Sequence, residues 1–239
     1  FGDPQRHVPV GSEVTIAGTF TELKGMKYED IPDYGRSVSG TQTVQIGGTK
    51  IEIPHLAFGV NSLSNKNSAY FREAFLHVFF TSLLKPIHLI LTNNGSKTVE
   101  NVRAILRIDM DKGAAMDEME FSKYRKPPKA QIDIYGRGEF QDISAARRIY
   151  GTEVQKLDTH FLVTCTFNRL HPGESEFASA FYFAGKASEV SINGKLYADD
   201  TPPQDVTLTV HYNRDEKSMT LDDLVDSLSP EPTQEDDDI

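Results

Sequence analysis

The stretch PIHLILTNNGSKTVENVRAILRID, residues 86–109, limits the possible folds of this chain more than any other segment. Apolar side chains occupy every second position on both sides of the turn NNGS. The predicted inward side holds Ile87, Leu89 and Leu91, then Val102, Ala104, Leu106, Ile108 and Met110. Polar residues such as Arg103 and Arg107 fall between the apolar ones. This alternation predicts strands, and one polar face is typical of antiparallel sheets that are half exposed to water.

Turn signals separate several further segments of the same kind. Strands are predicted at residues 131–135, 153–157, 160–167, 177–183, 189–198 and 205–212, and a hairpin is predicted for TQTVQIGGTKIEIP at 41–54. The pattern predicts a mainly β fold: an immunoglobulin-like antiparallel Greek-key sandwich with one main α-helix and an N-terminal β-hairpin extension. The chain has no tryptophan and a single cysteine, which excludes an antibody-type domain.

The one long helix is predicted over residues 69–84, with Ser68 as N-cap and Pro86 as stop. Its apolar surface is broad, and it includes Phe71, Phe75, Val78, Phe79, Phe80, Leu83 and Leu84. So broad a surface predicts a helix that packs on more than one side. We therefore expect Phe71, Phe75, Phe79 and Phe80 to contact a partner. The segment is too short and too charged to cross a bilayer, so no membrane is expected as a partner.

The chain divides into three predicted parts. An N-terminal extension at 1–64 carries the hairpin and packs on the sandwich, the sandwich itself spans 65–213, and 214–239 holds a short helix and an acidic disordered tail. Acidic runs such as the C-terminal EPTQEDDDI are usually solvated. Another short helix is predicted for SAARRIYG at 144–151, because serine suits its start and glycine its end.

The formal net charge of -10 argues against broad binding to a phosphate backbone, which needs a dense positive surface. One basic segment, SKYRKPPKAQ, departs from this trend. Its predicted contact residues for nucleic acid or an acidic partner are Lys123, Tyr124, Arg125, Lys126 and Lys129. Cations beside an aromatic ring suit both kinds of partner. A solvated loop between strands is the alternative interpretation of the same residues.

Reactive or metal-binding patterns are weak in this sequence. Cys165 lies on the apolar side of HFLVTCTF, which predicts a buried structural thiol. The segment DMDKGAAMDEME at 109–120 spaces its acids like a calcium loop, but Gly113 and Ala114 stand where a ligand and a glycine are needed. It is therefore predicted to be an acidic loop. The histidines lack the spacing of a helical zinc site. We expect no catalytic residue, no metal and no cofactor.

Several stretches together carry a family resemblance. They are FGDP at 1–4, IPDY at 31–34, SAYFREAFLHVFFTSLLKPIHLILTNNGSKTVENVRAIL at 68–106, LHPGESEFASAFYF at 170–183 and INGKLYADDTPPQDVTLTV at 192–210. In these the chain resembles the C-terminal region of bacterial Schlafen-like proteins that have an N-terminal AlbA-type nucleic-acid-binding domain. The resemblance implies a module appended to a Schlafen-like core. It also implies a link to antiviral defence, because some Schlafen-like proteins act as RNA-cleaving defence factors. Any nuclease residues would belong to that core and not to this chain.

These observations predict a non-catalytic interaction or sensor domain that mediates self-association or partner recognition, with nucleic acid reached through a neighbouring domain. No secretory signal pattern is visible, so a cytoplasmic location is expected. The alternative is an extracytoplasmic β-sandwich for adhesion or carbohydrate binding. Direct contact of residues 123–129 with nucleic acid is a third possibility.

Overall fold

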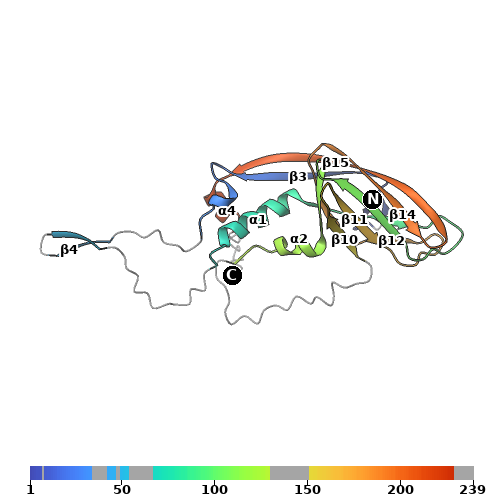
Figure 1. Cartoon of the computed structure of the whole chain (residues 1–239), viewed down its shortest axis with the longest axis horizontal. Coiled ribbons are helices and arrows are strands. Elements are labelled where there is room, and N and C mark those ends of the chain that lie inside the picture. The colour runs from blue at the N-terminus through green and yellow to red at the C-terminus, as the bar shows by residue number, and fades with distance from the viewer. Residues whose placement is uncertain (7, 34–41, 47–48, 54–66, 130–150, 229–239) are drawn as a thin grey trace, which may run out of the picture.

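The computed structural model describes residues 1–6, 8–33, 42–46, 49–53, 67–129 and 151–228 (Figure 1). Within these residues the chain is mainly β, with several sheets, one of which curls into a half-barrel. Two segments with predicted elements, the strand at 131–135 and residues 144–150 of the short helix, lie outside the described residues.

The largest sheet has six strands. Their order across the sheet is β10 (Thr152–Lys156), β11 (His160–Thr166), β8 (Arg103–Asp109), β14 (Glu189–Ala198), β15 (Thr201–Met219) and β3 (Glu13–Leu23). Every neighbouring pair is antiparallel except the last, since β15 and β3 run parallel. This pair departs from the all-antiparallel sheet that the sequence predicted. The pairing begins at Thr209 opposite Glu13, and β15 then continues past residue 212, where the predicted strand ended, as far as Met219 opposite Leu23.

Smaller sheets complete the β structure. A three-stranded sheet has the order β6 (Lys85–Ile87), β13 (Phe181–Gly185) and β9 (Gly113–Asp117). Three antiparallel pairs are β7 (Ile90–Thr92) with β12 (Ser175–Phe177), β1 (Gly2–Asp3) with β2 (Val8–Pro9), and β4 (Gln42–Ile46) with β5 (Thr49–Ile53). The last pair confirms the predicted hairpin. The predicted strands 87–92 and 177–183 are each divided, because the chain passes from one sheet to another within them.

The main core lies between the six-stranded sheet and the three-stranded one. Val102, Ala104, Leu106 and Ile108 are buried as predicted, while Arg103, Arg107 and their neighbours on the other side are exposed or half-buried. Met110, also predicted to point inward, is half-buried at the end of β8 and packs against this core. The alternation in residues 102–108 therefore gave the correct inward face. We call the two sheets and this core the body.

A second, smaller core lies at the other end of the molecule. It consists of Leu23, Ile31, Ala74, Met219 and Leu224. The elements around it are α1 (Tyr70–Leu83), α4 (Leu221–Asp226), the 3-10 turn η1 (Tyr28–Asp30) and the distal parts of β3 and β15. We call this region the helical end. Figure 1 shows α1 running beside the β3–β15 ribbon. The helix confirms the prediction for 69–84, but Ala69 and not Ser68 is its N-cap, and no side chain caps it.

A third helix, α2 (Glu118–Arg125), corrects two predictions at once. The sequence predicted an acidic loop at 109–120 and a basic loop after it, but β9 and α2 occupy most of this stretch. Asp117 caps the helix by accepting a hydrogen bond from the Glu120 N–H at 2.8 Å. Acidic residues fill the first turn and basic residues the last, which stabilises the helix through its dipole. Phe121 anchors it, because this ring is buried and stacks on Tyr182 at 3.7 Å.

Candidate functional site

The four phenylalanines predicted to contact a partner belong to a chain of aromatic rings along α1. Phe75 lies 6.2 Å from Tyr28 and 5.7 Å from Phe79 between ring centroids. Phe79 is also 5.5 Å from Phe20 of β3 and 5.3 Å from Phe80. Phe71 packs against the second core. The rings therefore make many contacts within the chain, and these contacts fix the position of α1.

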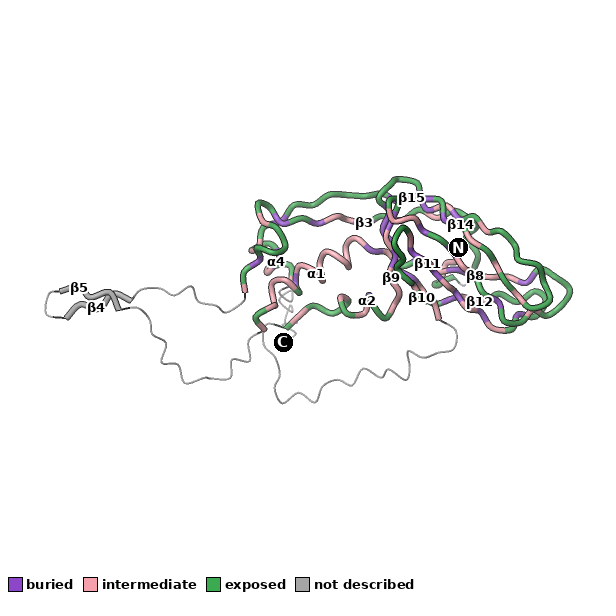
Figure 2. The backbone as a smooth tube through the Cα atoms, in the orientation of Figure 1, coloured by how far each residue is buried: buried purple, intermediate pink, exposed green. Residues whose placement is uncertain are grey.

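The contacts do not cover the helix. Ala74 is the buried residue of α1, while the other apolar residues of the helix are half-buried. Figure 2 shows this intermediate exposure along most of the helix, beside α2, which carries several exposed residues. The described elements that pack most extensively on α1 are β3, α2 and α4. The prediction that this helix packs on more than one side is therefore confirmed. Its use as a surface for another molecule stays a prediction.

The five residues of the predicted basic contact divide into two groups. The Tyr124 ring lies 4.3 Å from Phe80, and its carbonyl oxygen is 2.5 Å from His77 Nδ1, so Tyr124 holds α2 on α1. Arg125 forms an ion pair with Glu118 and donates a hydrogen bond to the Tyr182 hydroxyl, both at 2.5 Å. Burial raises the pKa of Tyr182, which keeps that hydroxyl protonated.

The other three, Lys123, Lys126 and Lys129, are exposed along α2 and after its end. A solvated loop was the alternative prediction for this segment, and the structure instead places Lys123 in the last turn of a helix. There the lysine stabilises the negative end of the helix dipole. The exposed cations of this segment besides Arg125 are therefore lysines, which bind as point charges and lack the bidentate geometry of arginine.

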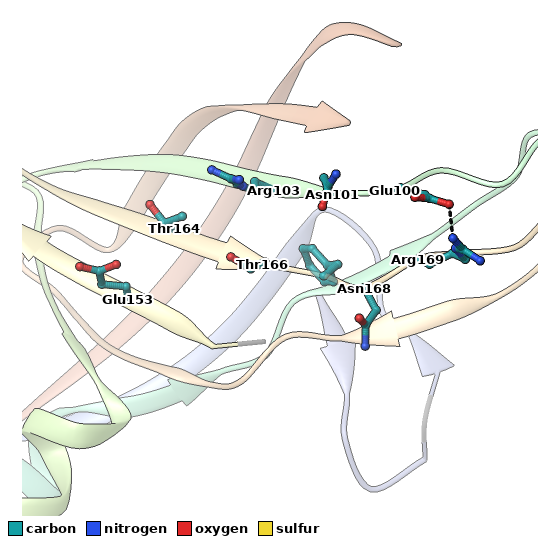
Figure 3. Close-up of a pocket in the computed structure, with 9 residues that line it drawn as sticks. Glu100, Asn101, Arg103, Glu153, Thr164, Thr166, Asn168 and Arg169 are labelled. Atoms are coloured by element: carbon teal, nitrogen blue, oxygen red, sulfur yellow. Dashed lines mark ion pairs between the residues drawn. The ribbon is translucent and has the colours of Figure 1, made fainter. Parts of the chain in front are cut away.

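A polar recess of about 570 Å³ lies on the body, where β8, β10 and β11 meet the loops at their ends (Figure 3). Glu100 and Arg169 form an ion pair across part of it. Its other polar lining residues are Asn101, Arg103, Glu153, Thr164, Thr166 and Asn168. The recess thus offers hydroxyls, amides and charges of both signs, which suits hydrogen bonding to a polar ligand.

A second, apolar cavity of about 300 Å³ lies between the body and the C-terminal half of α1. From α1 it is lined by Phe79, Phe80 and Leu83, and from β9 and β13 by small residues such as Ala114 and Ala184. Phe20 and Arg214 line it from the β3–β15 ribbon. Sequence analysis missed both hollows because their residues come from distant segments. For the apolar cavity the available signal was the alanine- and glycine-rich sequence GAAM in an otherwise bulky core.

Two of the reactive groups considered from sequence, Cys165 and Asp109, make contacts of a structural kind. Cys165 is fully buried, as predicted, and burial raises the pKa of its thiol to about 11. A thiol with this pKa stays protonated at neutral pH and is a poor nucleophile. Asp109, the first acid of the calcium-like spacing, accepts a hydrogen bond from Arg107 at 2.8 Å, and this bond lowers the pKa of the Asp109 carboxyl. Among the described residues, no three His, Cys, Asp or Glu side chains are grouped so that they could hold a metal ion.

Comparison with known proteins adds no family to these observations. No protein-family model matches the chain, and no curated protein matches its sequence at a significant level. The Schlafen-like resemblance therefore stays a prediction. In the described part of the chain, none of the helices has both the length and the apolar character that crossing a bilayer requires.

Proposed function

We propose that this chain is a non-catalytic interaction domain and that its surface formed by α1 and α2 contacts a protein partner. The observation that supports this most is the incomplete covering of α1. Five residues of α1 are aromatic, counting its first residue Tyr70, and all five are half-buried. The buried residue of this helix is the small Ala74. Aromatic side chains carry much of the binding energy in protein interfaces because each can bury a large area.

The neighbouring helix α2 fits the same role. Met119 is 66% exposed, which makes it the most exposed large apolar side chain among the described residues. Lys123 is exposed on the same helix. The aromatic residues of α1 and Met119 of α2, together with Lys123, suit a partner that has apolar anchor residues surrounded by acidic ones. Charges at the rim of an interface steer association. A second copy of this chain, with its net charge of -10, is one such partner.

Two finer proposals accompany this one. The packing of the six-stranded sheet on the β6–β13–β9 sheet around one shared core supports an immunoglobulin-like sandwich for the body. The resemblance in residues 68–106 supports a position beside a Schlafen-like core in the cytoplasm, where the chain would recognise a partner or a trigger of antiviral defence. The neighbouring Schlafen-like domain would then supply any contact with nucleic acid.

Site-specific photocrosslinking in the producing cells tests the interaction surface. A photoreactive amino acid replaces Met119 or Lys123 on α2, and as a matched control Lys195 on β14, which is exposed on the body. We expect discrete cross-linked products from the two α2 positions and none from the control. Light scattering after size exclusion then shows whether the product is a second copy. Equal cross-linking at Lys195, or none at either α2 position, would contradict the proposal.

The polar recess supports a second candidate function, carbohydrate binding. Its hydroxyls, amides and ion pair match the donors and acceptors of a sugar. The one aromatic residue in its lining is Phe167, which is only 3% exposed and offers no stacking face. This candidate therefore ranks second. Calorimetric titration with neutral and acidic oligosaccharides tests it, and Asn168→Ala should abolish any binding found.

A further inference from the structure

We propose that the apolar cavity is a binding site for an aliphatic carboxylate, such as a medium-chain fatty acid. This proposal does not rest on the protein partner proposed for α1 and α2, although Phe79 and Phe80 of α1 also line the cavity. The cavity is formed where the C-terminal half of α1, the strands β9 and β13 and the β3–β15 ribbon come together. Its volume of about 300 Å³ is at the lower end of the range for small-molecule sites.

Small side chains create the space. Ala114 and Ala184 face each other in the pairing of β9 with β13, and both line the cavity. Large side chains surround them elsewhere: Phe183 is fully buried next to Ala184 in the strand, and Phe80 lines the cavity from α1. Alanines among aromatic residues leave a hollow that the side chains of the described residues do not fill. A hollow of this kind lacks the packing contacts of a filled core, and a ligand restores them.

The lining favours an apolar ligand tail. Phe20, Phe79 and Leu83 present rings and methyl groups to the cavity. Apolar cavities hold water poorly because water finds no hydrogen-bond partners there. A hydrocarbon chain gains affinity by about fourfold for each methylene that it removes from water. A polar ligand such as a sugar would lose its own hydrogen bonds in the same place.

The charges at the cavity favour an anionic head group. Lys186 and Arg214 are the charged side chains among its described lining residues, and both are cations in a protein with a net charge of -10. The Arg214 guanidinium lies 4.3 Å from the Phe20 ring centre. Its Nη2 atom is 3.5 Å from the Oε1 atom of the Glu216 carboxylate. Lys186 Nζ donates a hydrogen bond to the Met110 carbonyl at 2.7 Å. These contacts hold the cations near the cavity, where they can bind a carboxylate by charge-assisted hydrogen bonds.

The end of α1 also lies at this cavity, and its carbonyl groups carry partial negative charge. Two of these carbonyls are already paired: Leu83 accepts a hydrogen bond from the Tyr212 hydroxyl at 2.5 Å, and Thr81 accepts one from Lys85 Nζ at 3.3 Å. These bonds reduce the repulsion that the helix end would exert on an anion. The carboxylate is therefore placed beside Lys186 and Arg214, with the tail along α1.

Calorimetric titration of the full chain with three ligands whose alkyl tails differ by at most one methylene group tests the proposal. Decanoate, decanol and decyltrimethylammonium are used below their micellar concentrations. We expect decanoate to bind with a stoichiometry of one and about tenfold more tightly than decanol, because the carboxylate adds charge-assisted bonds. Decyltrimethylammonium should bind more weakly than either. Equal or tighter binding of the cation would overturn the proposal, since it would indicate unspecific adsorption to an acidic protein.

Variants separate the tail from the head group. Ala114→Leu fills the cavity and should weaken the binding of both decanoate and decanol by about tenfold or more. The double substitution Lys186→Gln and Arg214→Gln should weaken decanoate by about tenfold and leave decanol unchanged. Lys195→Gln removes one charge far from the cavity and serves as the control. Both cations are exposed, so the double variant tests the site even if the filled variant does not fold. Wild-type affinity for decanoate in a folded double variant would contradict the assignment.

Discussion

The body and the helical end bury their apolar residues in different ways. In β8 the inward residues Leu106 and Ile108 are fully buried, and the outward residues that alternate with the inward ones are exposed or half-buried. In α1 almost every residue has intermediate exposure. A strand has two faces, so one sheet packed on its inner face is enough to cover it. A helix that is apolar on most sides needs several neighbours, and each element around α1 covers only a part of it.

Two strands join the regions. The first part of β15 belongs to the body, where it pairs with β14 as far as His211, and the rest continues with β3 to Met219. At the junction the Tyr212 hydroxyl donates its hydrogen bond to Leu83, the last residue of α1. Gly18 lies in the same place, and a Cβ atom there would collide with this hydroxyl and with the Leu83 carbonyl. Continuous backbone and this close contact therefore connect the regions, and Phe80 and Leu83 of α1 also pack against the main core.

The largest difference between the regions should appear when a buried leucine is shortened in each. Leu106→Ala in the body should lower the free energy of unfolding by about 2–5 kcal/mol. Leu224→Ala in α4 should cost less, because a six-residue helix can shift to close the space. Urea unfolding followed by circular dichroism measures both. A larger loss for Leu224→Ala would show that the helical end contributes more to stability than we infer.

The junction should be the next most sensitive place. Gly18→Ala should cost about 1–3 kcal/mol, because the added methyl group displaces the Tyr212 hydroxyl from Leu83. The neighbouring exposed residue supplies the control, since Ala17→Ser also adds one atom but in open solvent. Thermal unfolding of both variants makes the comparison. Equal melting temperatures would mean that α1 and β15 are not held together at this contact.

Tyr212→Phe removes only the hydrogen bond to Leu83 and should cost about 1 kcal/mol. Burial raises the pKa of Tyr212, so the folded state keeps the phenol proton up to a higher pH than the unfolded state does. This stabilisation is complete below the unfolded pKa of about 10 and is lost as the pH rises through the folded value. The stability of the wild type should therefore fall more steeply above that pH than that of Tyr212→Phe. Parallel pH profiles would contradict this.

The smallest effect is expected at the start of α4. The Thr220 hydroxyl accepts from the Asp223 N–H at 3.1 Å and the Asp223 carboxylate accepts from the Thr220 N–H at 2.8 Å, so Thr220→Ala should cost about 0.5–1 kcal/mol. The hydrogen bonds from Thr220 lower the pKa of Asp223. Stability from a lowered carboxyl pKa is present at neutral pH and is lost as the pH falls through the folded value. The difference between wild type and variant should therefore shrink in acid, as urea unfolding at several pH values would show.

Sequence reasoning succeeded where a residue's neighbours lie close along the chain. The alternation around Leu106 gave the inward face, and the apolar run to Leu83 gave the helix. It failed where distant segments decide the structure. Asn213–Ser218 show no alternation, and β15 includes them because β3 pairs with them. The helix α2 was missed because Phe121 is its one buried residue, and that residue packs on Tyr182 from far along the chain.

The parallel register of β3 and β15 also limits how the length of this protein can change. Inserting one residue near Tyr212 would turn every later side chain of β15 to the opposite side, so Met219 would leave the second core. An insertion of two residues would keep the sides but would put Thr220 and α4 out of step with Leu23 unless β3 grew as well. Homologous chains should therefore differ in this ribbon by even numbers of residues, with matching changes in both strands.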